Sequence, residues 1–270
     1  MYDFAALDGA LAGTIFAGKL HFSPTTGSTN TDAMAAGRNG APHGSVFFTE
    51  EQTAGRGRGD HGWQSVAGEG LYVSVLLRPA IAIENLPVIP LAAGLAAAQA
   101  IHLAAGIDVD LRWPNDLLIG ERKTGGILVE SKTEAGAAAF VVIGVGINVH
   151  QRAFDPGLST PATSLDLESG RTISRQALLI ALLESLQQET SGLHDPAVVA
   201  AIPAQVARMS TWLWNRRVEV HGPQSCVGIT AGLDARGFLL VRTDQGIVTV
   251  QTGGIRDAKN GLKEDNAAGS

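Results

Sequence analysis

Glycine is concentrated in one short stretch, and this stretch constrains the chain more than any other feature. Residues 52–63 read Gln-Thr-Ala-Gly-Arg-Gly-Arg-Gly-Asp-His-Gly-Trp, with arginines between the glycines. Glycine allows a backbone to approach a ligand closely, and guanidinium groups suit carboxylates and phosphates. The stretch contains G-x-G-x-x-G, but a strand-like run follows it where a dinucleotide fingerprint requires a helix. We therefore expect an anion-binding loop, with a flexible surface loop as the alternative.

Three further stretches combine polar or basic residues with a proline or a glycine, which change the conformations open to the backbone. Residues 112–116 read Arg-Trp-Pro-Asn-Asp, and Lys123 then opens an apolar strand, which indicates a partly enclosed lysine or a surface lysine at a turn. Gly144 and Gly146 fall on one face of a predicted strand, where they leave room for a flat ligand or for close packing. Residues 27–30, Gly-Ser-Thr-Asn, lie at the start of a predicted helix. There they form either an anion-binding site or a plain N-cap.

The pattern of the elements predicts a mixed α+β domain followed by a small β domain. Strand-like runs occupy residues 45–49, 71–77, 123–132 and 139–149, and helical patterns occupy residues 29–37, 90–105 and 174–191. After residue 209 the chain changes to short alternating runs separated by turns, which is typical of a small antiparallel barrel. We divide the chain into residues 1–208, residues 209–257 and a polar tail, residues 258–270, which we expect to be disordered.

Composition excludes several classes of protein. The single cysteine, Cys226, excludes a disulfide framework and a multi-cysteine metal site, which suits a cytoplasmic location. A net charge of −6 argues against a general nucleic-acid binder. No run of eighteen apolar residues is present and the first residues include two aspartates, so we expect neither a membrane span nor a signal peptide. The seven histidines do not fall at metal-ligand spacing, so any metal site stays unknown.

Taken together, these stretches resemble the biotin–protein ligases, which biotinylate the carrier subunit of acetyl-CoA carboxylase. The resemblance implies a mixed sheet with flanking helices, as in the catalytic domains related to class II aminoacyl-tRNA synthetases, and a small C-terminal SH3-like β-barrel. It also implies biotin, ATP and Mg²⁺ as ligands, a biotin carboxyl carrier protein as partner, and a possible homodimer. The matching residues are Ser28–Asn30, Glu51–Arg58, Trp113–Asp116, Lys123–Leu128 and Gly144–Asn148.

The resemblance also assigns roles to individual residues. It implies Lys123, Arg58 and Asp116 as catalytic residues, because attack of a carboxylate on a phosphate brings two anions together. The biotin-binding residues would be Ser28, Thr29, Gln52, Gly55, Arg56, Gly57, Arg58, Lys123, Gly126, Gly144 and Gly146. The nucleotide-binding residues would be Arg58, Trp63, Arg112, Asn115, Asp116, Lys123 and Asn148.

The sequence departs from the family pattern in three places. Arg112 stands where the family usually has lysine, and Asp60 stands where a basic residue is common, which leaves the roles of residues 59–62 open. About twenty residues precede the first core segment, so we expect no DNA-binding domain and no specific DNA binding. The alternatives are a lipoate or octanoyl ligase or transferase of the same superfamily, or a non-catalytic biotin sensor.

Overall fold

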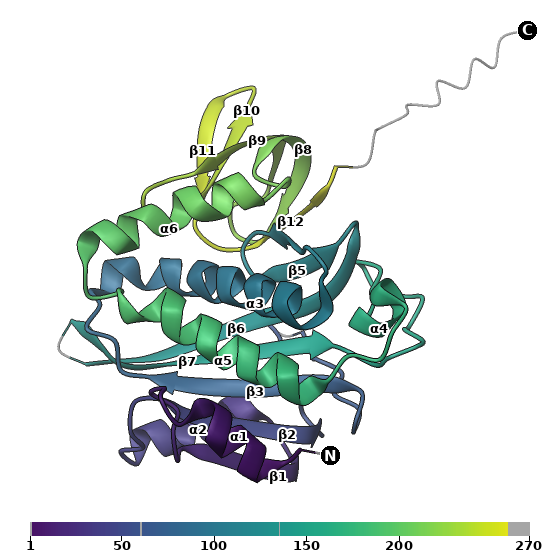
Figure 1. Cartoon of the computed structure of the whole chain (residues 1–270). Helices are drawn as coiled ribbons and strands as arrows, with labels where there is room; N and C mark the ends of the chain where they lie inside the picture. The colour runs from purple at the N-terminus through teal and green to yellow at the C-terminus, as the bar shows by residue number, and fades with distance from the viewer. Residues whose placement is uncertain (1, 60, 135, 259–270) are drawn as a thin grey trace, which may run out of the picture.

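A computed structural model describes residues 2–59, 61–134 and 136–258 (Figure 1). The helices are α1 (Phe4–Leu11), α2 (Thr29–Arg38), the 3₁₀ helix η1 (Ile83–Val88), α3 (Ile89–Ala105), α4 (Leu165–Ser169), α5 (Arg175–Ser191) and α6 (Pro196–Met209). The first seven strands are β1 (Leu20–Thr26), β2 (Ser45–Gln52), β3 (Gly70–Leu77), β4 (Asp110–Arg112), β5 (Asp116–Ile119), β6 (Arg122–Glu134) and β7 (Ala137–Asn148). The last five are β8 (Trp214–His221), β9 (Cys226–Leu233), β10 (Leu239–Thr243), β11 (Gly246–Val250) and β12 (Gly254–Asp257).

The first seven strands form one mixed sheet in the order β1-β2-β3-β7-β6-β5-β4. Only β1 and β2 pair in parallel; the other neighbours are antiparallel. The strands at its centre are apolar on both faces, and every residue of β3 is buried. A strand of this kind has to be covered on both sides, which requires layers above and below the sheet.

Helices α3 and α5 cover one face of this sheet, with α1 beside them (Figure 1). The alanine-rich surface of α3 allows α5 to pack closely, and most of the molecule's buried apolar side chains belong to this layer. Helix α2 packs on the opposite face, where Ala33 and Met34 meet Leu76 and Phe140 in a smaller cluster. The stretches that the sequence marked as chemical lie on the α2 face.

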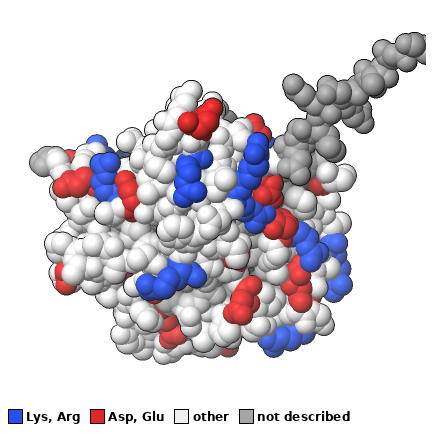
Figure 2. Space-filling model, turned by 90° about the horizontal axis from the view of Figure 1, so that it is seen from above, with Lys and Arg blue, Asp and Glu red and all other residues white. Residues whose placement is uncertain are grey.

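The last five strands form a separate antiparallel sheet in the order β11-β10-β9-β8-β12. It lies above the central sheet at the end of α6, and in Figure 2, which looks down on this side, basic and acidic side chains are interspersed. The predicted fold class, a mixed sheet with flanking helices plus a small antiparallel C-terminal unit, is confirmed. The division at residue 208 stays a prediction, and residues 259–270 of the predicted tail lie outside the described residues.

Several elements were not predicted from the sequence. Helix α6 contains Pro203, and proline usually breaks a helix, so the sequence did not predict one here. In the structure the helix continues past the proline to Met209. Strand β1 contains Pro24 and lies at the sheet edge, where a missing N–H is tolerated. Strands β4 and β5 are too short to give a period, and they hydrogen-bond only because the turn between them brings them together.

One helical segment, Ile83–Ala105, is long and apolar enough to cross a membrane by length and composition. About two thirds of its most apolar window (67%) is buried inside the protein, against α5 and the central sheet. The segment is therefore accounted for as the core helix of the fold, and the predicted absence of membrane association stays a prediction.

Candidate active site

A cavity of about 780 Å³ opens between the α2 face of the central sheet and the C-terminal sheet. Its walls come from the start of α2, the end of β2 with the following loop, β3, the turn between β4 and β5, strands β6 and β7, the segment 151–162 and the C-terminal sheet. Apart from Gly55, every site residue proposed from the sequence lines this cavity; those residues are Ser28, Thr29, Gln52, Arg56, Gly57, Arg58, Trp63, Arg112, Asn115, Asp116, Lys123, Gly126, Gly144, Gly146 and Asn148.

Three glycines form the floor of the cavity. Gly126 of β6 pairs with Gly146 of β7, and Gly144 lies two residues earlier on the same face. A Cβ atom at Gly144 would lie 2.0 Å from Asn30 Oδ1, and one at Gly146 would lie 2.5 Å from Trp63 Nε1. The bare backbone is therefore already covered by two protein side chains, so in this structure the glycines permit close packing as well as room for a ligand.

The end of the cavity at α2 carries a network of neutral polar groups. The amide oxygen of Gln52 accepts from the backbone N–H of Thr29 at 2.9 Å and from its hydroxyl at 3.2 Å. Ser74, which no sequence motif marked, donates to Thr29 Oγ1 at 2.7 Å or Asn30 Oδ1 at 2.6 Å. Ser28 caps α2 by position but not through its side chain. Directed donors and acceptors of this kind suit a neutral polar head group.

The glycine–arginine loop folds as a short hairpin beside the cavity. The backbone N–H of Gly57 donates to His61 O at 2.7 Å, and that of Trp63 donates to Gly55 O at 2.9 Å. A Cβ atom at Gly55 would lie 2.3 Å from Trp63 O, so only glycine fits this position. Asp60 lies outside the described residues. Gly59 has a φ of +64°, a conformation that glycine adopts without strain.

The two arginines of this loop point to different partners. Arg56 forms a short ion pair with Glu130 of β6, and the same Glu130 oxygen accepts from Asn30 Nδ2 at 2.9 Å. Arg58 instead donates to Gly253 O and, at 2.9 Å, to Thr252 Oγ1, both in the loop before β12. Burial lowers the pKa of Arg58, while the negative charge of Asp116 opposes that shift. Arg58 therefore attaches the hairpin to the C-terminal sheet.

Trp63 ends the hairpin and lies on the glycine floor rather than outside it. Its ring is 3.4 Å from the position of a Cβ at Gly126, and Lys123 Nζ lies 5.5 Å from the ring centroid. The indole N–H is buried and has no hydrogen-bond partner among the described residues. The prediction that Trp63 binds the nucleotide stays a prediction; its ring lies over Gly126 and Gly146, between the polar end and the cationic end of the cavity.

The other end of the cavity carries a buried carboxylate between two cations. Asp116 Oδ1 lies 2.5 Å from Lys123 Nζ, and Asp116 Oδ2 accepts from Arg112 Nη2 at 2.7 Å. Burial by itself raises the pKa of Asp116, but Lys123 and Arg112 outweigh this effect and lower the pKa below its usual value. The Lys123 side chain is only 28% exposed, which excludes the alternative of a solvated surface lysine.

The remaining predicted nucleotide residues hold the backbone around this end. Asn115 Nδ2 donates to Ile127 O at 2.8 Å and Asn148 Nδ2 donates to Thr163 O at 3.1 Å. Arg112 also donates to Thr160 Oγ1 at 2.9 Å. These side chains line the cavity, and their contacts fix the β4–β5 turn against β6 and fasten the segment 160–163 beside it. Their role in nucleotide binding stays a prediction.

Glu130, Ser74, Thr160 and the loop at Thr252 and Gly253 are contacts that the sequence reasoning missed. Ser74 and Glu130 lie on the site-facing positions of β3 and β6, so strand alternation together with a known register would have found them. Within the described ranges, no group of three or more His, Cys, Asp or Glu side chains forms a metal site.

Comparison with known proteins places this architecture in a family. Residues 22–148 match the model of the Biotin/lipoate A/B protein ligase family. The chain is 34% identical over 242 residues to the biotin--[acetyl-CoA-carboxylase] ligase of Mycobacterium tuberculosis, covering 85% of both chains. It is 34% identical over 241 residues to the bifunctional ligase/repressor BirA of Bacillus spizizenii, covering 87% of this chain and 73% of that protein.

A solved structure agrees with this assignment. The biotin protein ligase of Aquifex aeolicus in complex with biotin and ATP superimposes with a TM-score of 0.77 and 26% identity, covering 89% of this chain and 100% of that one. The similarity therefore extends over most of the chain. On these grounds the chain belongs to the biotin protein ligase family.

Proposed function

We propose that this protein activates biotin with ATP to form biotinyl-5′-adenylate and transfers the biotinyl group to a lysine of a biotin carboxyl carrier protein. The observation that carries the proposal is the layout of one cavity, with a neutral polar end at Thr29 and Gln52 and a cationic end at Lys123 and Arg112. Biotin has the matching polarity, because it joins a neutral ureido head to a carboxylate. The named functions of the relatives support the same reading.

The first half-reaction joins two anions, and the cationic end offsets their repulsion. A biotin carboxylate oxygen attacks the α-phosphorus of ATP, a new P–O bond forms, and the bond to the β-phosphate oxygen breaks with departure of pyrophosphate. Lys123 is the flexible cation at this end and can reach both the carboxylate and the α-phosphate. Arg58, which also lines the cavity, adds a further positive charge there while it stays attached to the loop before β12.

Asp116 acts in this scheme by holding the cations and not as a base. Its carboxylate is ionised and contacts both Lys123 and Arg112, and its lowered pKa makes it a poor proton acceptor at neutral pH. In the ligand-free state it offsets two adjacent positive charges in a buried site. When the substrates bind, Lys123 exchanges this partner for their oxygens.

The second half-reaction needs the adenylate to survive until the carrier arrives. The unprotonated amine of the carrier lysine attacks the biotinyl carbonyl carbon, AMP leaves with the electron pair of the broken C–O bond, and the nitrogen loses one proton to solvent, which gives the amide. Water would compete for the same carbon, so the adenylate has to be enclosed. The hairpin with Trp63 forms the cover on one side, and the loop before β12 forms the edge to which Arg58 attaches it.

Mg²⁺ enters this scheme only with the triphosphate. Asp116, the acidic side chain at the cationic end, is engaged by Lys123 and Arg112, so the protein offers the metal no prepared site among the described residues. An ion bound to the phosphates would supply further charge neutralisation. Location in the cytoplasm, a homodimer and the absence of specific DNA binding remain proposals that rest on the sequence.

One experiment tests the function and separates it from its alternatives. The protein is incubated with labelled biotin, ATP, Mg²⁺ and a purified carrier domain, and a carrier whose acceptor lysine is replaced by arginine serves as the control. We expect label on the parent carrier and none on the control. Labelling by lipoate or octanoate instead of biotin would indicate the lipoate branch, and biotin binding without label transfer would indicate a sensor.

A further inference from the structure

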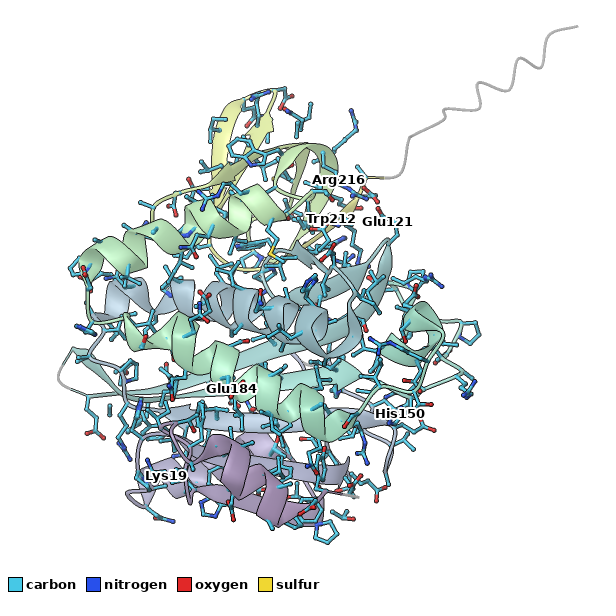
Figure 3. The ribbon with its side chains drawn as sticks, in the orientation of Figure 1. Lys19, Glu121, His150, Glu184, Trp212 and Arg216 are labelled. Carbon is cyan, nitrogen blue, oxygen red and sulfur yellow. The ribbon has the colours of Figure 1, made fainter. Side chains whose placement is uncertain are left out.

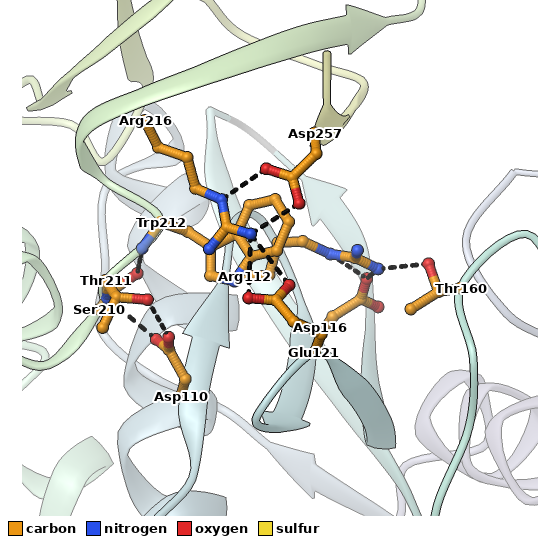
Figure 4. Close-up of polar contacts among 10 residues, drawn as sticks. All are labelled: Asp110, Arg112, Asp116, Glu121, Thr160, Ser210, Thr211, Trp212, Arg216 and Asp257. Atoms are coloured by element: carbon orange, nitrogen blue, oxygen red, sulfur yellow. Dashed lines mark hydrogen bonds and ion pairs between the residues drawn. The ribbon is translucent and has the colours of Figure 1, made fainter. Parts of the chain in front are cut away.

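The segment that joins α6 to the C-terminal sheet is fastened to the cationic end of the cavity. Ser210 Oγ donates to Leu111 O at 2.6 Å. The backbone N–H of Thr211 donates to Asp110 Oδ1 at 3.1 Å (Figure 4). Both acceptors belong to β4, whose last residue is Arg112. The connection therefore holds Trp212 directly beside the turn that carries Asp116.

Trp212 lies between two arginines that come from different sheets. Its side chain is 2% exposed, and its indole N–H has no hydrogen-bond partner among the described residues. The guanidinium carbon of Arg216, from β8, lies 3.5 Å from the ring centroid, and that of Arg112 lies 5.1 Å from it. A buried aromatic face attracts such cations strongly because water does not compete for them.

Arg216 is itself held by carboxylates from both sheets (Figures 3 and 4). Its Nε and Nη2 donate to Asp257 of β12 at 2.7 Å and 2.6 Å, and Nη2 also contacts Glu121 at 2.9 Å. Glu121 lies in the turn between β5 and β6. Asp116 is the first residue of β5, and Lys123 is the second residue of β6. Through Glu121, the stack of Arg216 on Trp212 is thus attached to the turn of the β5–β6 hairpin, whose two strands present Asp116 and Lys123.

We propose that Trp212 and Arg216 are positioning residues for adenylate formation, acting through Arg112 and Asp116 on Lys123. The contacts form one continuous series: Arg216 on Trp212, Trp212 against Arg112, Arg112 on Asp116 Oδ2, and Lys123 on Asp116 Oδ1. The inference rests on the proposed function. It assigns the C-terminal sheet a part in the first half-reaction, although neither Trp212 nor Arg216 lines the cavity.

The reason for the effect is the small number of contacts that orient Arg112. Besides Asp116, its guanidinium meets Thr160 Oγ1 and the Trp212 ring, and the side chain is buried. If the ring tilts, Arg112 and the carboxylate bound to it shift together, and Lys123 Nζ moves with its partner. A misplacement of this kind lowers the rate of a step that depends on exact approach of two anions, and leaves binding of the ureido head unchanged.

The test measures the two half-reactions separately in the variant Arg216→Met, which keeps the length of the side chain and removes its charge. This change removes the cation from the Trp212 ring together with its ion pairs to Asp257 and Glu121. We expect kcat for biotin-dependent ATP–pyrophosphate exchange to fall about tenfold, with KM for biotin within about twofold of the parent value. Transfer to the carrier from supplied biotinyl-5′-adenylate should stay within about twofold.

Two further variants make the result specific. Arg216→Lys keeps the charge and should recover most of the exchange rate. Trp212→Phe keeps an aromatic ring and should give an exchange rate between those of the parent and Arg216→Met. It tests the same contacts if Arg216→Met folds poorly. Arg217→Met changes the next residue of β8, an exposed arginine without a side-chain partner among the described residues, and should match the parent.

The outcomes distinguish this inference from the function on which it rests. A folded Arg216→Met protein with parental exchange would overturn the positioning role. Equal losses in exchange and in transfer, together with a lowered unfolding temperature, would show that Trp212 and Arg216 only stabilise the fold. That result would also overturn the positioning role. A parent protein without any biotin-dependent exchange would overturn the proposed function, and the inference with it.

Discussion

Lys123 illustrates what a single residue's sequence context can and cannot reveal. The apolar strand after it predicted a partly enclosed amine, and the structure confirms the enclosure. Its 2.5 Å contact with Asp116 could not be derived, because it depends on how the irregular β5–β6 pairing shifts register between Leu117 and Leu118. In the same way, Asn30 contacts the backbone at Gly144 because α2 packs on this face of the sheet. The sequence spacing of the two residues gives no information about that packing.

At the residue scale, Lys123→Ala should abolish most adenylate formation and leave the fold intact. The amine contacts the reacting oxygens chiefly in the transition state, so its loss should cost on the order of 10²–10³ in the rate of biotin-dependent ATP–pyrophosphate exchange. Lys132→Ala is the matched control, because Lys132 lies farther along the same strand and is 47% exposed. Near-parental exchange by a folded Lys123→Ala protein would refute the assigned role.

Asp116 makes a second residue-scale prediction, on pH. Its pKa is lower in the folded protein than the ordinary value of 3.8, so its ionised form contributes stability above that pH, and the contribution is lost as pH falls through the lowered pKa. Asp116→Asn should reduce the free energy of unfolding at neutral pH by about 2 kcal/mol and flatten its decline in acid. Urea unfolding at several pH values checks both effects; an unchanged acid limb would contradict the charge pairing.

At the scale of elements, the sequence predicted the strands and helices that carry a clear period and missed those defined by their neighbours. Strands β3 and β7 are long apolar runs and α5 has leucines at helical spacing behind Ser174, so local pattern sufficed. The glycine–arginine stretch was predicted as a loop without further structure. It forms a hairpin because Gly55 and Gly57 allow its two arms to approach within hydrogen-bonding distance.

The hairpin gives the element-scale prediction, which concerns Arg58. Arg58→Ala removes the contacts to Thr252 and Gly253, so the cover over the cavity should open more often and release biotinyl-adenylate. The released anhydride acylates exposed lysines, and a bystander protein such as serum albumin should therefore be biotinylated more than by the parent. Thr252→Ala, which removes one of the two acceptors, should give a smaller increase. Equal bystander labelling by parent and Arg58→Ala would argue against the hairpin as a cover.

At the scale of the whole molecule, the site belongs to both sheets. The central sheet supplies the glycine floor and the Asp116–Lys123 pair, and the C-terminal sheet supplies the loop that meets Arg58 and the stack on Trp212. Trp113 adds a further link, because its indole N–H donates to Gly237 O at 3.1 Å. The sequence predicted the C-terminal unit from its alternating runs but not this sharing, since contacts between distant segments leave no local pattern.

The most direct measurement of the central claim is mass spectrometry of the protein after it is mixed with biotin, ATP and Mg²⁺ but no carrier. The cavity should hold biotinyl-5′-adenylate, close to one molecule per protein, with release of pyrophosphate. On addition of carrier, that adenylate should disappear as AMP and biotinylated carrier appear together. A protein that holds only unmodified biotin, or a carrier that becomes labelled without release of AMP, would contradict the account.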